Sequence, residues 1–170
     1  HAWRAGSISS GSKIHWLNAL PENQYLPNIL NISEKILDTC VIMYICSPSN
    51  PHGGIASLNY LKNAILLARK YGFILAIDEC YSDIYRLNKP KPVGGLDAAL
   101  SLGDNLDNLI VFNSLSKRSN ASGMRAGFIS GDEKIIDSYK LLVSNGASPV
   151  PIPIQKAAAS LYDDEEHNTE

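Results

Sequence analysis

The feature that most constrains the fold is a series of continuous apolar runs rich in β-branched residues. These runs cover residues 41–46, 73–77, 109–112 and 126–129. Because they lack regular alternation of apolar and polar residues, they are typical of strands covered on both faces. Between the first two runs, Ser57 can cap a helix and Gly72 can end it in a left-handed conformation. Strands alternating with helices predict an α/β fold, with a mainly parallel sheet and helices on both faces.

The spacing of apolar residues predicts the other elements. In the helix after Ser57 they recur at steps of three and four residues, at Leu58, Leu61, Ile65 and Ala68. Two more helices are predicted over residues 132–143 and 154–162, and the first should bury a stripe made of Ile135, Ile136, Tyr139 and Leu142. Residues 13–18 are a short extended candidate, and residues 88–95 read as a surface loop. No linker divides the chain, so we expect a single domain over residues 1–170.

Composition argues against several classes of protein. Apolar residues make up 45% of the chain and charged residues 19%, which is ordinary for a globular domain. The formal net charge is −2 and the isoelectric point is near 6.1, so no basic excess is available to bind a nucleic-acid backbone. The apolar run over residues 41–46 is far shorter than the roughly 20 residues that a membrane span requires. We therefore expect neither nucleic acid nor a membrane as a partner.

The cysteines and histidines show no ligand spacing. No two of the three cysteines, Cys40, Cys46 and Cys80, have C-x-x-C spacing. Each lies in or beside an apolar stretch, so we expect buried, reduced thiols. This fits a reducing compartment, and we expect the cytoplasm. The four histidines are scattered along the chain, and no metal site is predicted.

Unusual polar groups follow three of the apolar runs, at the sheet edge where open α/β folds bind ligands. The first run leads to Asn50, the second to Asp78 and Tyr81, and the third to a segment that contains Ser114, Ser116, Lys117 and Arg125. A lysine near serines and an arginine suggests an amine nucleophile beside a phosphate-sized anion site. Taken singly, each group has a structural explanation, such as a cap, a turn or a surface lysine. Their order and spacing together favour chemistry.

Three ordered motifs give the chain a resemblance to a known family. They are Asn50-Pro51-His52-Gly53, Asp78-Glu79-Cys80-Tyr81, and Ser114-x-Ser116-Lys117 followed by Gly123-x-Arg125-x-Gly127. Together they resemble the signature of the fold-type I aminotransferases, which depend on pyridoxal 5'-phosphate. The resemblance covers about residues 16–164. His52 stands where a threonine is common, and because that residue chiefly shapes the turn, we expect little chemical consequence.

The resemblance implies a catalytic role for three of these residues. Lys117 would form a Schiff base with the cofactor aldehyde and later move a proton between the substrate and cofactor carbons. Asp78 would pair with the pyridine nitrogen and keep it protonated, so that the ring can accept electrons. Tyr81, together with Asn50, would hydrogen-bond the ring oxygen of the cofactor.

The same resemblance implies a phosphate site. Ser114, Ser116 and Arg125 would hold the cofactor phosphate, the arginine through a charge-assisted contact. Gly123 and Gly127 would either let the backbone approach closely or be plain loop glycines. The resemblance implies no metal.

The implied reaction is transfer of an amino group from an amino acid to a 2-oxo acid such as 2-oxoglutarate. Residues 24–28 and 114–125 are most similar to the N-succinyldiaminopimelate aminotransferases, which implies N-succinyl-LL-2,6-diaminopimelate as donor and a place in lysine biosynthesis. Aspartate, alanine and aromatic aminotransferases carry similar runs. Two alternatives stay open: another fold-type I enzyme such as a C–S lyase, or an inactive truncated fragment that binds cofactor or serves in dimerisation.

The chain resembles only the central part of the family's large domain. We expect an N-terminal segment and a C-terminal small domain to be absent, and with them a phosphate-binding glycine loop, a ring-stacking aromatic and a substrate-carboxylate arginine. Arg69, Arg86 and Arg118 are poor substitutes for that arginine and are expected to be surface residues. The family pattern implies a homodimer of the full-length protein.

Overall fold

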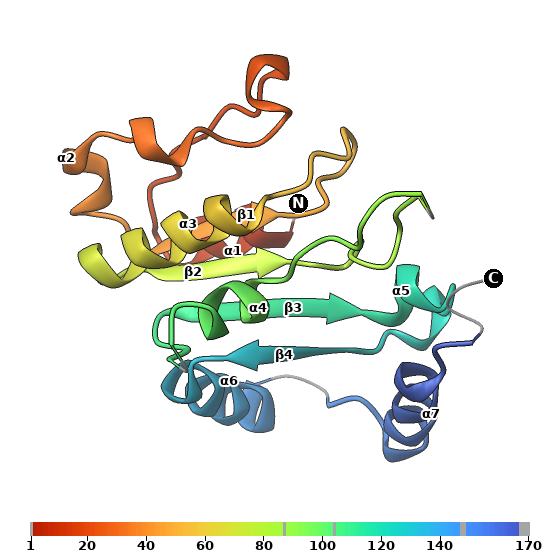
Figure 1. Cartoon of the computed structure of the whole chain (residues 1–170). Coiled ribbons are helices and arrows are strands. Elements are labelled where there is room, and N and C mark those ends of the chain that lie inside the picture. The colour runs from red at the N-terminus through yellow and green to blue at the C-terminus, as the bar shows by residue number, and fades with distance from the viewer. Residues whose placement is uncertain (1, 87, 104, 147–148, 167–170) are drawn as a thin grey trace.

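The computed structural model describes residues 2–86, 88–103, 105–146 and 149–166, which form a sheet flanked by helices (Figure 1). In the described part of the chain the sheet has four strands, which lie side by side in chain order: β1 (Ile42–Cys46), β2 (Ile74–Asp78), β3 (Leu109–Ser114) and β4 (Gly127–Gly131). The first three strands are parallel, and β4 is antiparallel to β3. The mainly parallel sheet expected from the sequence is therefore confirmed.

The direction of β4 follows from its short connection to β3. A parallel return requires a crossover of a dozen or more residues, usually with a helix that runs back along the sheet. The connection contains only the single turns α5 (Leu115–Arg118) and η3 (Ser122–Met124). The chain therefore turns back at the same edge, and Ser114 pairs with Gly127.

One face of the sheet packs on α3 (Leu58–Tyr71) and α4 (Gly95–Leu100). Alternate residues of each parallel strand point into this core because side chains alternate along a strand. The buried strand residues are Met43, Ile45, Leu75, Ile77, Leu109 and Val111. They meet the buried face of α3, formed by Leu61, Ala64, Ile65 and Ala68. This layer contains most of the buried apolar surface and fixes the strand ends.

The ends of α3 are those that the sequence predicts. The Ser57 hydroxyl accepts a hydrogen bond from the backbone N–H of Tyr60 at 3.2 Å, which satisfies one of the free donors of the first turn. Gly72 has φ +74°, a left-handed conformation that favours glycine, and its N–H bonds to the Ala68 carbonyl.

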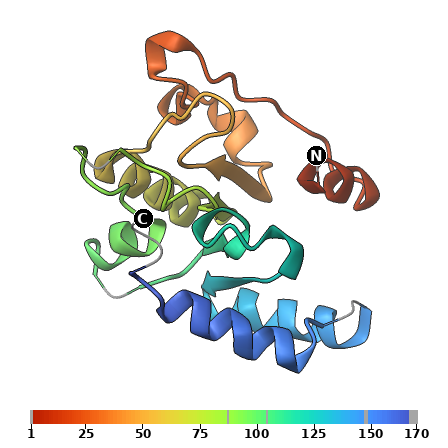
Figure 2. The same cartoon turned by 90° about the vertical axis from the view of Figure 1, so that its right-hand side faces the viewer.

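The opposite face of the sheet carries α1 (Ala2–Ser9), which lies across the strands from α3 and α4 (Figure 2). Aromatic rings connect α1 to the strands. The Trp3 ring stacks on Tyr44 of β1 at 6.3 Å between centroids, and Tyr44 stacks on Phe112 of β3 at 6.1 Å. Trp3 also meets Trp16 edge-on at 5.1 Å. Helices on both faces are thus confirmed, although α1 itself was not predicted.

The remaining helices are short or peripheral. They are η1 (Pro21–Asn23), η2 (Ile29–Asn31), α2 (Glu34–Leu37), α6 (Glu133–Gly146) and α7 (Ile152–Asp163). The last two confirm the predicted helices over 132–143 and 154–162. Within the predicted loop, residue 95 instead begins α4. Residues 13–18 form no strand; beyond them, Ala19 makes an isolated bridge to Pro27.

The expected buried stripe of α6 is wrong. Tyr139 is 45% exposed and Leu142 is 65% exposed, and among its described side chains none is buried. The helix lies beside β4, at the end of the sheet (Figure 1). Because the helix packs beside an edge strand, its apolar side chains stay partly or largely exposed.

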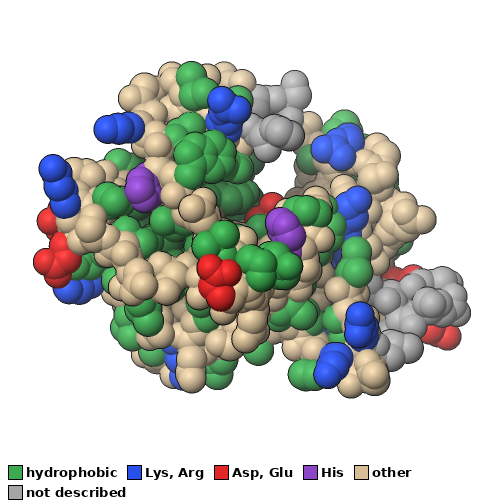
Figure 3. All heavy atoms as spheres, turned by 90° about the horizontal axis from the view of Figure 1, so that it is seen from above, with side chains coloured by type: hydrophobic (Ala, Val, Ile, Leu, Met, Phe, Trp, Pro, Cys, Tyr) green, Lys and Arg blue, Asp and Glu red, His purple; other side chains and the backbone are tan. Residues whose placement is uncertain are grey.

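Two surface properties bear on the expectations from composition. Cys40, Cys46 and Cys80 are free thiols, as expected, but they are half-buried rather than buried. Across the described residues, no helix has both the length and the apolar character needed to cross a membrane. Seen from above, the molecule carries basic and acidic side chains scattered among hydrophobic ones (Figure 3).

Candidate active site

The carboxyl ends of β1, β2 and β3 bring together most of the polar residues singled out from the sequence. Asn50 lies in the turn after β1, Asp78 ends β2, and Ser114 ends β3. The turn after β1 is held by its serines. The buried Ser47 hydroxyl accepts the N–H of Ala56 at 2.9 Å, and the Ser49 hydroxyl accepts that of Gly54 at 2.9 Å. These bonds fix the loop on which Asn50 is carried.

Asn50, Tyr81 and Lys117 come from three separate segments and meet at this edge. The Asn50 amide nitrogen donates a hydrogen bond to the Tyr81 hydroxyl at 2.9 Å. The Lys117 ammonium nitrogen lies 5.8 Å from the centre of the Tyr81 ring, within the range of a cation–π contact. Lys117 and Asn50 are exposed, and Tyr81 is half-buried. The structure therefore places an accessible amine beside an amide–phenol pair.

Asp78 is enclosed by its neighbours in the sheet. It pairs with Cys46 of β1 and with Phe112 of β3, and one carboxylate oxygen accepts the N–H of Cys80 at 3.1 Å. The pKa of Cys80 is raised to about 12, chiefly by burial and to a smaller extent by a hydrogen bond to Asp78 and by the negative charge of Asp78. Within the described part of the chain, no lysine or arginine forms an ion pair with Asp78. This carboxylate is therefore available to a cationic ligand group.

Burial and the charge of Asp78 also act on Tyr44, on the same side of the sheet. Burial is the larger cause, and together they raise the pKa of Tyr44 to about 12. The phenol therefore stays neutral at physiological pH.

Ser114 and Ser116 form a small hydroxyl pair where β3 meets α5. The Ser114 hydroxyl accepts the N–H of Ser116 at 3.2 Å and donates to the Ser116 hydroxyl at 3.0 Å. Arg125 does not join them. Its guanidinium donates to the Ser122 carbonyl at 3.1 Å, and its backbone has φ +51°. Of the predicted phosphate site, the serines are together and the arginine is turned to its own loop.

The two glycines of the third motif differ in role. A Cβ on Gly127 would collide with the Asn113 carbonyl oxygen, so glycine is required there for β4 to approach β3. A Cβ on Gly123 would meet no atom within 4 Å. Close backbone approach is therefore confirmed for Gly127, where it serves the sheet.

Glu79 was not singled out from the sequence as a separate group. Its carboxylate accepts the N–H of Gly95, at the start of α4, at 2.6 Å, and burial raises its pKa to about 7. The signal that could have revealed it is strand parity: successive side chains alternate between the two faces, so Glu79 turns toward α4 while Asp78 turns away. Arg118 was also misjudged, because its side chain is 7% exposed rather than at the surface.

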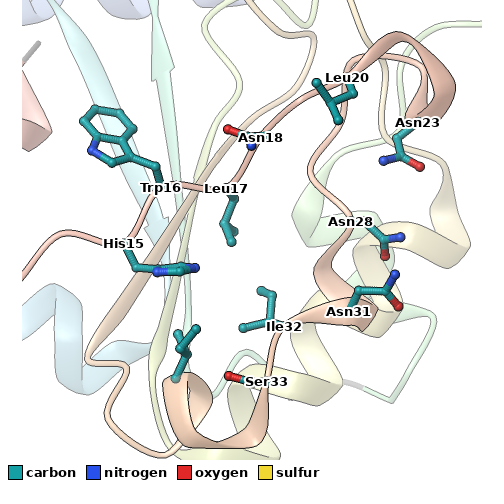
Figure 4. A pocket seen from close by; sticks show the side chains of 11 residues that line it. His15, Trp16, Leu17, Asn18, Leu20, Asn23, Asn28, Asn31, Ile32 and Ser33 are labelled. Carbon is teal, nitrogen blue, oxygen red and sulfur yellow. The ribbon is translucent and has the colours of Figure 1, made fainter.

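Two cavities lie away from these residues. One cavity, of about 420 Å³, lies between residues 15–23 and residues 28–36, with His15, Trp16 and Asn31 among its lining (Figure 4). The other cavity, of about 410 Å³, is lined by residues of two segments, 22–30 and 55–63. Neither cavity is lined by the candidate site residues Asn50, Asp78, Tyr81, Ser114, Ser116, Lys117 and Arg125.

Comparison with known proteins decides the family. The sequence model described as "Aminotransferase class I and II" matches residues 9–170. The chain belongs to this family. The aminotransferase from Neisseria meningitidis superposes with a TM-score of 0.91 at 38% identity, covering 98% of this chain and 42% of that one.

Two curated relatives show the range of substrates named in this family. The chain is 37% identical over 126 residues to the 4-dedimethylamino-4-oxo-anhydrotetracycline transaminase of Streptomyces rimosus, covering 74% of this chain and 34% of the relative. It is 31% identical over 161 residues to LL-diaminopimelate aminotransferase 2 of Nostoc sp., covering 94% of this chain and 40% of the relative. This aminotransferase chain thus spans about two fifths or less of the length of these relatives.

Class I and II aminotransferases use pyridoxal phosphate, and the donor set at the sheet edge has the chemistry that this cofactor requires. Asp78 is a carboxylate without a cationic side-chain partner among the described residues, and Lys117 is an exposed primary amine. The hydroxyls of Ser114 and Ser116, with the guanidinium of Arg125 on the following loop, suit a phosphate dianion. The residues present fit the cofactor.

Proposed function

We propose that this chain is the cofactor-binding part of an aminotransferase that moves an amino group from an amino acid to a 2-oxo acid such as 2-oxoglutarate. The observation that carries the proposal is the meeting of Asn50, Tyr81 and Lys117 beside Asp78 at one sheet edge. Pyridoxal phosphate, when bound, supplies a cationic ring that withdraws electrons from the substrate carbon.

Lys117 acts as the amine nucleophile and as the base that carries the substrate proton. Two features of its surroundings support this role. The amine is exposed, so a substrate can reach it, and the Tyr81 ring lies within 5.8 Å. A lysine that takes a proton from a carbon and returns one must stay within hydrogen-bond reach of that carbon. The neighbouring Tyr81 ring and the short turn α5 restrict where the Lys117 amine can lie, which favours this role.

Asp78 would favour the protonated form of the pyridine nitrogen through its negative charge. An opposite charge within a few ångströms favours the charged form of a titrating group, and the half-buried position of Asp78 strengthens this effect. Asn50 and Tyr81 provide hydrogen-bonding groups for the ring oxygen, already joined to each other at 2.9 Å. Ser114, Ser116 and Arg125 would hold the phosphate, and the arginine side chain would turn from Ser122 to do so.

The amino donor that we propose is a diaminopimelate, either free or N-succinylated. The support is the run of LL-diaminopimelate aminotransferases among the relatives, such as that of Dehalococcoides mccartyi at 33% identity over 162 residues. With such a donor, the role that we propose for the protein is in lysine biosynthesis. We further propose that the full-length protein is a cytoplasmic homodimer without nucleic-acid or membrane partners, and that its N-terminal segment and small domain complete the site.

The experiment that tests this function is amino transfer by the full-length protein loaded with pyridoxal phosphate. Glutamate formed from 2-oxoglutarate is measured with LL-diaminopimelate or its N-succinyl derivative as donor. We expect Lys117→Ala to abolish transfer and Lys89→Ala, at an exposed lysine in a loop, to leave it unchanged. Transfer by Lys117→Ala at a near-normal rate would refute the mechanism. Transfer from other amino acids only would refute the proposed donor.

A further inference from the structure

Arg118, the residue after Lys117, is a charged side chain enclosed by protein. Its side chain is 7% exposed, although it ends the single helical turn α5. Burying a guanidinium is costly unless its donors are satisfied. Here they contact two other segments of the chain: the end of α7, through Leu161, Tyr162, Asp164 and Glu165, and the loop after β2, through Asp83.

The first group of contacts joins Arg118 to the C-terminal end of α7. One terminal nitrogen donates to the Leu161 carbonyl at 2.7 Å, and the other donates to the Tyr162 carbonyl at 3.0 Å. The second nitrogen also donates to the Glu165 carboxylate at 2.6 Å. The last carbonyls of a helix lack partners within the helix and carry its negative dipole end, so a cation is stabilised there.

The second contact joins Arg118 to the loop that carries Tyr81. The Arg118 Nε lies 3.9 Å from a carboxylate oxygen of Asp83, two residues after Tyr81. The Asp83 side chain is 9% exposed, and its other oxygen is 2.9 Å from the Lys91 ammonium. Arg118 therefore bridges the Tyr81 loop and the end of α7, from its own place beside Lys117.

The turn α5 depends on such outside contacts. Four residues form one turn, which is too short to be stable by itself because the cost of starting a helix is not repaid. Leu115, fully buried, fixes the first residue of the turn, and Arg118 fixes the last. Lys117 lies between them and is exposed. Its distance from the Tyr81 ring is thus set by whatever holds Arg118.

We propose that Arg118 is a positioning residue for Lys117. By tying α5 to the end of α7 and to Asp83, its guanidinium holds the Lys117 amine at the Tyr81 ring. A lysine at position 118 cannot do the same, because its single nitrogen cannot meet acceptors on both segments, whereas the planar fork of arginine can. This inference rests on the proposed function of Lys117.

The test measures how fast pyridoxal phosphate becomes fixed to Lys117 in the full-length apo-protein. The cofactor is added at saturating concentration, borohydride quenches samples at intervals, and the labelled peptides are quantified by mass. The variants are Arg118→Ala and Arg118→Lys, with Arg86→Ala as a control that removes an exposed arginine from the loop after β2. Non-covalent cofactor affinity and thermal unfolding are measured alongside.

We expect both Arg118 variants to label Lys117 about tenfold or more slowly than wild type, since small misplacements of a reacting group cost large factors in rate. Part of the label should move to other lysines. Cofactor affinity should change by less than about threefold, because the phosphate contacts are intact. A purely structural role would instead lower affinity and thermal stability with no redistribution of label. Arg86→Ala should match wild type.

Wild-type labelling rate at Lys117 in Arg118→Ala would overturn the inference. If both Arg118 variants fail to fold, Asp83→Asn decides, because it weakens one tie without altering α5. We then expect slower labelling at Lys117, and an unchanged rate would overturn the inference. Failure of wild type itself to take the label on Lys117 would refute the proposed function rather than this role of Arg118.

Discussion

The residues at the sheet edge differ in how firmly the protein holds them before any ligand arrives. Asn50 and Tyr81 are bonded to each other, and Asp78 is enclosed by two strands and by the N–H of Cys80. The side chains of Lys117 and Arg125 are exposed. The carboxylate of the candidate site is thus held by the sheet, whereas the guanidinium of Arg125 must turn from the Ser122 carbonyl to reach the two serines.

This difference predicts unequal effects of two substitutions in the full-length enzyme. Asp78→Ala should reduce kcat by about a hundredfold or more, because it removes the charge that keeps the ring nitrogen protonated. Tyr81→Phe should cost less than about tenfold, because it removes one neutral hydrogen-bonding group. Steady-state rates of amino transfer check this, with exposed Asp107→Ala as the control. Equal and small losses would mean that Asp78 has only a structural role.

Glu79 predicts a pH dependence of stability. Burial raises its pKa from 4.5 to about 7, so the folded state holds the proton more tightly than the unfolded state does. The stability contribution is therefore fully present below about pH 4.5 and is lost as the pH rises through about 7. The shift corresponds to about 3 kcal/mol.

Glu79→Gln should remove this loss because the side chain stays neutral at every pH. Urea unfolding between pH 4.5 and 8 measures it: the variant should gain stability relative to wild type as the pH rises, and exposed Glu22→Gln should follow wild type. Parallel profiles for Glu79→Gln and wild type would contradict the assignment.

Among the elements, those with strong local signals were predicted well. The helix α3 has the predicted serine cap and glycine stop, and of its predicted apolar stripe Leu61, Ile65 and Ala68 are buried whereas Leu58 is exposed. The strands β1, β2 and β3 were found within two residues at each end. The sequence also allowed most of the candidate site residues to be placed together, because the carboxyl ends of parallel strands meet at one edge of a sheet. These residues are Asn50, Asp78, Tyr81, Ser114 and Lys117.

The elements that sequence reasoning missed depend on distant contacts. The turn α5 has no helical signal of its own and is held by Leu115 and Arg118. The helix α4 begins at Gly95, whose N–H bonds to Glu79, sixteen residues earlier. The apolar spacing of α6 correctly predicted a helix, but it wrongly predicted that the apolar side chains of this helix would be buried.

This contrast between helices can be tested by two alanine substitutions. Leu61→Ala in α3 removes a fully buried side chain and should lower the free energy of unfolding by about 3 kcal/mol. Leu142→Ala in α6 removes a side chain that is 65% exposed and should change it by less than about 0.5 kcal/mol. Urea denaturation of the 170-residue chain measures both. A comparable loss from Leu142→Ala would mean that α6 is packed more closely than the structure indicates.

At the scale of the whole molecule, the chain is a sheet with one well-covered face and with the candidate site at the carboxyl ends of its strands. The side chains of this site lie outside both cavities described above, and three of them, Asn50, Lys117 and Arg125, are exposed. The relatives are more than twice as long as the segment that they share with this chain. We therefore expect the 170-residue chain alone to bind the cofactor weakly and to turn over no substrate, because exclusion of water strengthens every electrostatic contact in a site.

The most direct test of the central claim is to map the lysine to which the cofactor becomes attached. Pyridoxal phosphate is added to the full-length protein, borohydride fixes it covalently, and the labelled peptide is identified by mass. We predict a single dominant label on Lys117, lost in Lys117→Arg and kept in Lys89→Arg. A label spread over many lysines, or one that persists in Lys117→Arg, would contradict the assignment of this sheet edge as the active site.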